Sequence, residues 1–194
     1  MSANIIEETR KNTHVFNQTL DTLLWVAQTR SIDPQRAILS AVHIEPDPIC
    51  ATKTLMVATD GRRLHFARVD KVLESGDYKI WKSSPMAFFA ASHDFGQQYP
   101  KFQSVIPKLG KDDKLKKIEL VPGKPDYGVR LFKIAFQFHA LKKAFFNLNY
   151  LRQATDGMSN GCFAFQSSDI DPVLIQDSES DWTRLAVVMP VRVQ

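Results

Sequence analysis

Two short strings constrain the fold of this chain more than any other feature of its sequence. Val57-Ala-Thr-Asp-Gly-Arg-Arg-Leu64 is apolar at its start, contains an Asp-Gly turn dipeptide and leads into a second apolar stretch, a pattern typical of a β-hairpin. Leu185-Ala-Val-Val-Met-Pro-Val-Arg-Val193 is an apolar run interrupted by Pro190. Because proline cannot donate to a sheet ladder, we expect this strand at an edge, at a bulge or at a strand end.

Length and composition are those of an ordinary folded protein. The 194 residues, of which 44% are hydrophobic and 24% charged, suffice for one large or two small domains with a sizeable core. No run of about eighteen apolar residues is present, and the polar first twelve residues lack the apolar stretch of a signal peptide. We therefore expect a cytoplasmic protein with no membrane partner.

The cysteines and histidines do not indicate a metal site. Cys50 and Cys162 are isolated, without the CxxC spacing of a zinc site or the density of a disulfide framework. We expect both to be reduced and structural. The histidines are scattered and none pairs by spacing with a ligand or a nucleophile, so no metal or other cofactor is predicted.

Apolar periodicity and turn residues predict an α+β fold with two lobes. Lobe one spans residues 1–98, residues 99–114 form an interdomain linker rich in lysine and proline, and lobe two spans 115–194. In lobe one we expect helices over 17–30 and 86–92, and strands over 37–44, 54–58, 64–69 and 78–81. In lobe two we expect a helix over 149–156, and strands over 115–121, 129–138, 143–148, 162–166, 173–176 and 185–191.

A third string gives the first two a common context. Tyr99-Pro-Lys-Phe-Gln-Ser-Val-Ile-Pro107 lies between them, and the three strings in this order resemble the bacterial DNA sliding clamp, the beta subunit of DNA polymerase III. A partial fourth match joins Phe146–Leu151 to Pro172–Asp177. The chain is roughly half the length of that three-domain subunit, so it resembles a shortened clamp. The resemblance implies two reduced clamp domains, with antiparallel sheets outside and short helices inside.

Clamps of this family hold polymerases and repair factors by a short peptide that docks in an apolar groove between two domains. Carried over to this chain, one wall of the groove would be Thr59, Gly61, Arg62, Arg63 and Leu64. The other wall would be Pro100, Val105, Val173, Val187, Met189, Pro190, Val191 and Arg192. The residue types suit such a site, because methionine and valine give adaptable apolar contacts and glycine permits close approach. Arg63 or Arg192 can bond a peptide carbonyl or carboxylate.

The resemblance also implies that duplex DNA is enclosed without base preference, through a positive inner surface. The net charge of +4 permits this. The candidate DNA contacts are Arg30, Lys79, Lys82 and Arg152, and the expected helices carry few basic residues for a surface that faces DNA. Ring closure would need a homo-oligomer, and two clamp-like domains would require three copies to give six.

Two alternatives remain open. The chain could be an interaction module that keeps the groove without enclosing DNA. It could also be an enzyme using Asp60, His65, Asp70 or Asp94, but it carries no GxGxxG, GxxxxGK[ST], HExxH or GxSxG string. We therefore predict a binding factor with no catalytic residues.

Overall fold

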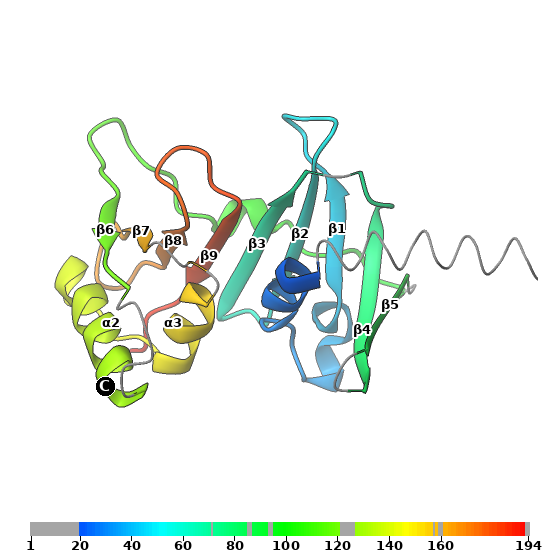
Figure 1. Ribbon diagram of the computed structural model, residues 1–194, viewed down its shortest axis with the longest axis horizontal. Coiled ribbons are helices and arrows are strands. Elements are labelled where there is room, and N and C mark those ends of the chain that lie inside the picture. The colour runs from blue at the N-terminus through cyan, green and yellow to red at the C-terminus, as the bar shows by residue number, and fades with distance from the viewer. Residues whose placement is uncertain are drawn as a thin grey trace, which may run out of the picture.

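A computed structural model describes residues 20–192, except 71, 85–86, 93–94, 121–126, 157 and 159–160, and describes only the backbone of 81–84, 87–92 and 127–130. Its centre is one antiparallel sheet of nine strands in the order β5-β4-β1-β2-β3-β9-β8-β7-β6 (Figure 1). The strands are β1 (Val42–Pro46), β2 (Thr54–Thr59), β3 (Arg63–Val69), β4 (Gly76–Ser84), β5 (Ala87–Ser92), β6 (Lys116–Ile118), β7 (Cys162–Phe165), β8 (Val173–Gln176) and β9 (Arg184–Val188).

The sheet is continuous across the two predicted lobes. Strands β1 to β5 come from the first half of the chain and β6 to β9 from the second, and the two sets meet where β3 pairs with β9. The register there sets Leu64 opposite Val187 and His65 opposite Ala186. The predicted α+β fold class is confirmed, whereas the lobe boundaries at residues 98 and 115 stay predictions.

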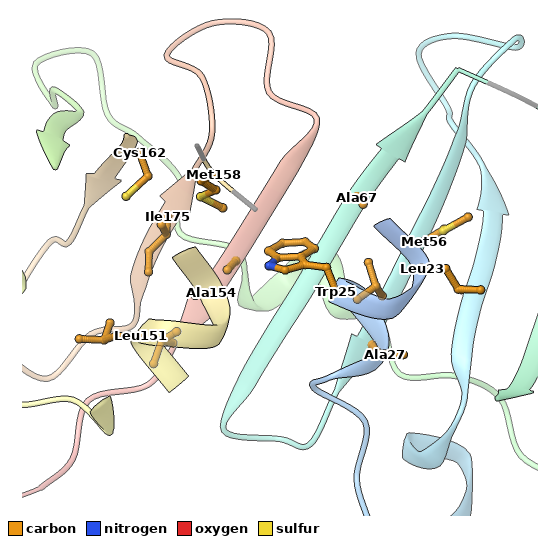
Figure 2. Packing of buried hydrophobic residues seen from close by; sticks show 14 of the residues in the cluster. Leu23, Trp25, Ala27, Met56, Ala67, Leu151, Ala154, Met158, Cys162 and Ile175 are labelled. Carbon is orange, nitrogen blue, oxygen red and sulfur yellow. The ribbon is translucent and has the colours of Figure 1, made fainter. Parts of the chain in front are cut away.

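Helices cover one face of this sheet (Figure 1). A helix over residues 20–27 lies against the first half, and α2 (Tyr127–Lys142) and α3 (Leu148–Thr155) lie against the second. The Trp25 indole N–H donates to the Gln153 carbonyl at 2.9 Å and links the two helix groups. Figure 2 shows the apolar side chains between helices and sheet, with Trp25, Leu151 and Ile175 among them.

Part of the segment 99–114, for which we keep the name linker, packs on the central strands of the other face. Strand residues alternate between the two faces, so that Met56 and Ala58 join the helix-side core while Leu55 and Val57 join a second core on the linker side. A short 3₁₀ helix, η2 (Phe102–Val105), puts the Phe102 ring into that second core. Another, η1 (Pro34–Ser40), precedes β1.

Three predicted elements are wrong. The predicted helix over 86–92 is strand β5, which pairs with β4. The predicted strand over 129–138 lies in α2, where Ile134 and Phe138, four residues apart, share the buried face. The predicted strand over 143–148 is a connection that ends in the first residue of α3.

Other predicted elements need only adjustment at their ends. The strand expected over 37–44 is β1, which starts later because η1 occupies residues up to Ser40. The helix expected over 17–30 is present over 20–27, and its predicted start lies outside the described residues. No helix in the described part of the chain is long and apolar enough to span a membrane.

Candidate functional site

The turn between β2 and β3 is held by its own side chains. The Asp60 carboxylate accepts from the backbone N–H of Arg62 at 2.9 Å and of Arg63 at 3.1 Å. The Thr59 hydroxyl donates to the Arg63 carbonyl at 2.6 Å and accepts from the Gly61 N–H at 3.0 Å. Aspartate and threonine are favoured in such turns because their short side chains bond nearby backbone groups.

Gly61 has a backbone conformation that favours glycine, with φ of 86°. A Cβ atom here would lie 3.0 Å from a guanidinium nitrogen of Arg36, which belongs to η1. The hairpin predicted from the Asp-Gly dipeptide is therefore confirmed.

The last strand lies beside this turn. Strand β9 pairs with β3, and beyond the end of β9 the Met189 N–H donates to the Arg62 carbonyl at 2.9 Å. Leu64 and Val187, which are opposite each other in the register, are both in the linker-side core. Two strings that are distant in the sequence thus form one surface.

That surface contains an apolar cavity of about 190 Å³. Its floor includes Leu64 and Val187, which are nearly fully buried, whereas Val105 and Met189 are 51% and 43% exposed at its rim. The cavity is lined by Leu39, Thr59, Gly61, Arg62, Arg63, Leu64, Pro100, Lys101, Phe102, Val105, Val187 and Met189. We call this cavity the groove.

Most of the predicted groove residues meet here, and four do not. Pro190, Val191 and Arg192 are outside the lining, and the Val191 N–H instead donates to the Phe145 carbonyl at 2.7 Å, near the helices. Placing Val173 in the groove is wrong, because its side chain is fully buried in the helix-side core on the opposite face of the sheet.

The Arg63 guanidinium is already bonded within the fold. Its Nε donates to the Asp60 carboxylate at 2.9 Å, its other nitrogens donate to the Gln28 carbonyl at 3.0 Å and to the Gln153 side chain, and it lies 4.2 Å from the centre of the Tyr150 ring. Only 10% of this side chain is exposed. Arg63 therefore connects the turn to both helix groups, and the predicted bond from it to a peptide is not supported.

The exposed cations at the groove are Arg62 and Lys101. Lys101 was missed by sequence analysis, as were Phe102 and Leu39. Lys101 and Phe102 lie within the linker string, so their positions in the motif could have indicated them. Leu39 comes from η1, and no sequence signal connected that segment to the site.

Tyr99 helps to hold the linker on the sheet. Its ring stacks on His43 with centroids 4.7 Å apart, and burial raises the pKa of the Tyr99 phenol. The His43 Nδ1 lies 2.8 Å from an Asp77 oxygen, and its Nε2 lies 3.3 Å from a Glu45 oxygen. Phe102 adds a contact with Phe66, with ring centroids 5.4 Å apart.

The residues predicted to contact DNA are dispersed. The half-buried Arg30 guanidinium donates to the Ala27 carbonyl at 3.0 Å and to the Ile80 carbonyl at 2.5 Å, and burial lowers its pKa. Arg152 lies 3.9 Å from the Asp156 carboxylate. Arg30 therefore links helix and sheet, and its contact with phosphates stays a prediction.

The two predicted lysines are on β4. Lys79 is exposed, and because its neighbours Tyr78 and Ile80 join the helix-side core, its side chain lies on the opposite face from the helices. Lys79 therefore lies apart from the helices, and its contact with DNA stays a prediction. Lys82 also belongs to β4, and its side chain lies outside the described part of the structure.

The candidate catalytic groups that the structure describes, His65, Asp70 and Asp60, are not assembled into a site. His65 is fully buried, stacks on Trp25, and has its pKa lowered to about 3 by burial. Asp70 pairs with Lys53 at 3.0 Å, and Asp60 is bonded within its turn. Asp94 lies outside the described residues. Among the described residues, no group of three or more His, Cys, Asp or Glu side chains could hold a metal ion.

Solved structures of bacterial DNA sliding clamps resemble this chain over most of its length. The beta sliding clamp of C. crescentus matches over 91% of this chain and 64% of its own, with a TM-score of 0.63 and 16% identity. The DNA polymerase sliding clamp of Bacillus subtilis matches over 92% of this chain and 63% of its own length, with a TM-score of 0.62 and 13% identity. The clamp of Bartonella birtlesii matches over 91% and 64%, with a TM-score of 0.60 and 20% identity.

The chain therefore has the fold of the bacterial DNA polymerase III beta sliding clamps. It spans less than two thirds of the length of these clamps. No protein-family model matches the sequence, and no curated protein matches it either.

Proposed function

We propose that this protein is a non-catalytic clamp-type tethering factor that binds a short peptide of a DNA polymerase or repair protein in the groove. The observation that carries the proposal is the apolar cavity of about 190 Å³ where the β2–β3 turn, the end of β9 and the linker meet. Such a role also implies a cytoplasmic location.

The groove has the features of a site for an extended peptide. Its buried floor of Leu64 and Val187 can take apolar side chains, and the partly exposed Met189 can adapt to them. Arg62 and Lys101 at the groove can bond a peptide carboxylate or carbonyl. A clamp with the same fold, from Bartonella birtlesii, has been solved bound to griselimycin.

The direct test is fluorescence polarisation of a labelled polymerase-tail peptide with the full chain, with griselimycin as competitor. We expect binding at a dissociation constant on the order of micromolar, reduced in the Met189→Ala variant. Ile170→Ala is the matched control, because Ile170 is a large apolar residue, 69% exposed, outside the groove lining. Equal affinity of all three proteins would contradict the proposal.

Enclosure of duplex DNA by a homo-oligomer is the second candidate. The end strands β5 and β6 each have one partner strand in the described sheet, which leaves an edge for pairing with another copy. Exposed Lys133 and Lys142 on α2 add positive charge to the helix face. A cavity near Trp25 is lined by Asp21 and Asp156 against one cation, Arg184, which makes that part of the face less suited to phosphates and favours a module that does not enclose DNA.

Light scattering and DNA binding at several salt concentrations distinguish the ring from the module. A salt-resistant trimer whose DNA affinity falls steeply with added salt would support the ring. A monomer that binds the peptide but not duplex DNA would support the module.

A further inference from the structure

A second apolar surface lies at the end of the molecule that α2 occupies, opposite β4 and β5 (Figure 1). Phe132 and Phe136 on α2 are 71% and 65% exposed, Phe145 in the connection to α3 is 56% exposed, and Leu148 at the start of α3 is 45% exposed. We call these four side chains the aromatic face. Large apolar side chains gathered on a surface in this way mark an interaction site more often than isolated ones do.

The chain shapes this face into a cavity. Lys143, the residue that follows α2, has a φ of 59°, a conformation uncommon for residues other than glycine. Its N–H donates to the His139 carbonyl at 2.7 Å and closes the end of the helix. The turn brings Phe145 back to His139, with ring centroids 4.9 Å apart. The cavity, of about 190 Å³, is lined by Phe132, Ala135, Phe136, His139, Ala144, Phe145, Phe146, Leu148 and Leu151.

The charge around the aromatic face has one predominant sign. Residues 127–155 contain two arginines and three lysines and no aspartate or glutamate, and Lys133, Lys142 and Lys143 are exposed. Lys142 lines a further cavity together with Asp112 and Asp113, and Arg152 pairs with Asp156, so Lys133 and Lys143 are the cations among the described side chains that are left for a partner. Glu119 lines a neighbouring cavity together with Lys133. Two copies that met through this same face would bring these lysines together, which disfavours a symmetric dimer here. A partner with carboxylates around its apolar residues is complementary in charge.

We propose that the aromatic face is a second docking site, separate from the groove, for an acidic amphipathic segment of a partner protein. An apolar side chain of the segment fills the cavity between α2 and Phe145, as in helix-in-groove recognition. Carboxylates on its polar side pair with Lys133 and Lys143. The two sites share no lining residue, because the groove lies on the linker-covered face of the sheet.

The probe is a synthetic amphipathic peptide of about fourteen residues, with leucines at helical spacing and glutamates elsewhere, and its twin with lysine in place of glutamate. Titration of the labelled peptides with the full chain should show that the glutamate peptide binds about tenfold more tightly than its lysine twin. This difference in affinity should become smaller as salt is added. The Phe136→Ala variant should bind the glutamate peptide about tenfold more weakly. Ile170→Ala and Met189→Ala should leave this binding unchanged, since neither residue lines this cavity.

Charge is tested separately by Lys133→Gln and by Lys143→Asn, in which asparagine tolerates the left-handed backbone conformation. Each substitution should weaken binding of the glutamate peptide and should not weaken binding of its lysine twin. Equal binding of the two peptides would overturn the proposal. If a thymidine oligonucleotide binds more tightly than the glutamate peptide, and the Phe136→Ala variant no longer binds it, the proposal is overturned in favour of single-stranded nucleic acid. A dimer abolished by Phe136→Asp would overturn it in favour of a second copy.

Discussion

The backbone N–H of Met189 donates to the carbonyl of Arg62 at 2.9 Å. This bond continues the pairing of β3 with β9 past the end of β9, so the last apolar residues of the chain lie along the β2–β3 turn. The groove depends on this pairing, because its lining combines residues of the β2–β3 turn with Val187 and Met189 of the terminal segment.

Met189 and Val105 should act as anchors for a peptide in the groove. Replacing either by alanine removes a partly exposed apolar rim contact without opening a cavity in the core, and each change should reduce affinity by roughly 1–3 kcal/mol. Fluorescence polarisation with the polymerase-tail peptide measures this loss, and Ile170→Ala provides the baseline. If both variants bind as tightly as the unaltered chain, the peptide does not occupy this groove.

Arg63 should contribute to stability more than to binding. Arg63→Ala leaves the Asp60 carboxylate without its charged partner and removes donors to Gln28 and Gln153, so we expect a loss of about 2–4 kcal/mol in the free energy of unfolding. Arg62→Ala, a change at the neighbouring exposed arginine, should cost less than about 0.5 kcal/mol. Urea denaturation of both variants compares them, and equal losses would show that the Arg63 network is not structural.

Because His65 is buried, the free energy of unfolding should decrease as the pH is lowered. Burial lowers its pKa from 6.5 to about 3, so between these values the unfolded chain binds a proton that the folded chain does not. The contribution is fully present above pH 6.5 and is lost as the pH falls towards 3. Between pH 6.5 and 5 the loss should be about 2 kcal/mol.

The variant for this test is His65→Phe, which keeps an aromatic ring beside Trp25 and does not titrate. Its free energy of unfolding should decline less than that of the unaltered chain over the same pH interval, as followed by urea denaturation at each pH. Parallel declines would assign the acid sensitivity to other groups.

The two cysteines should differ in reactivity. Burial raises the pKa of the Cys162 thiol to about 12, whereas the hydrogen bond from Thr52 lowers the pKa of the half-exposed Cys50 thiol. Because the thiolate is the reactive form, a thiol reagent should modify Cys50 in the folded protein and Cys162 only after unfolding. Mass spectrometry of the labelled protein separates the two sites, with Cys50→Ser as control. Rapid modification of Cys162 in the native protein would contradict this prediction.

The prediction of secondary structure succeeded where residues act on their own backbone. Asp60 and Thr59 bond the turn that contains them. It failed where the apolar pattern suited either kind of element. Residues 87–92 became a strand because they pair with β4, and residues around Ile134 and Phe138 became a helix because its buried side packs against the core.

The sequence by itself determined the hairpin at Asp60, the extended terminal segment and the resemblance to the clamp, because each is written in contiguous residues. Only the tertiary structure decided which side chains line the groove. It placed Leu39 and Phe102 there, put Val173 on the opposite face and bonded the Arg63 guanidinium to distant residues. The physical reason is that burial, facing and hydrogen bonding depend on partners far away in the chain, and local periodicity carries no information about them.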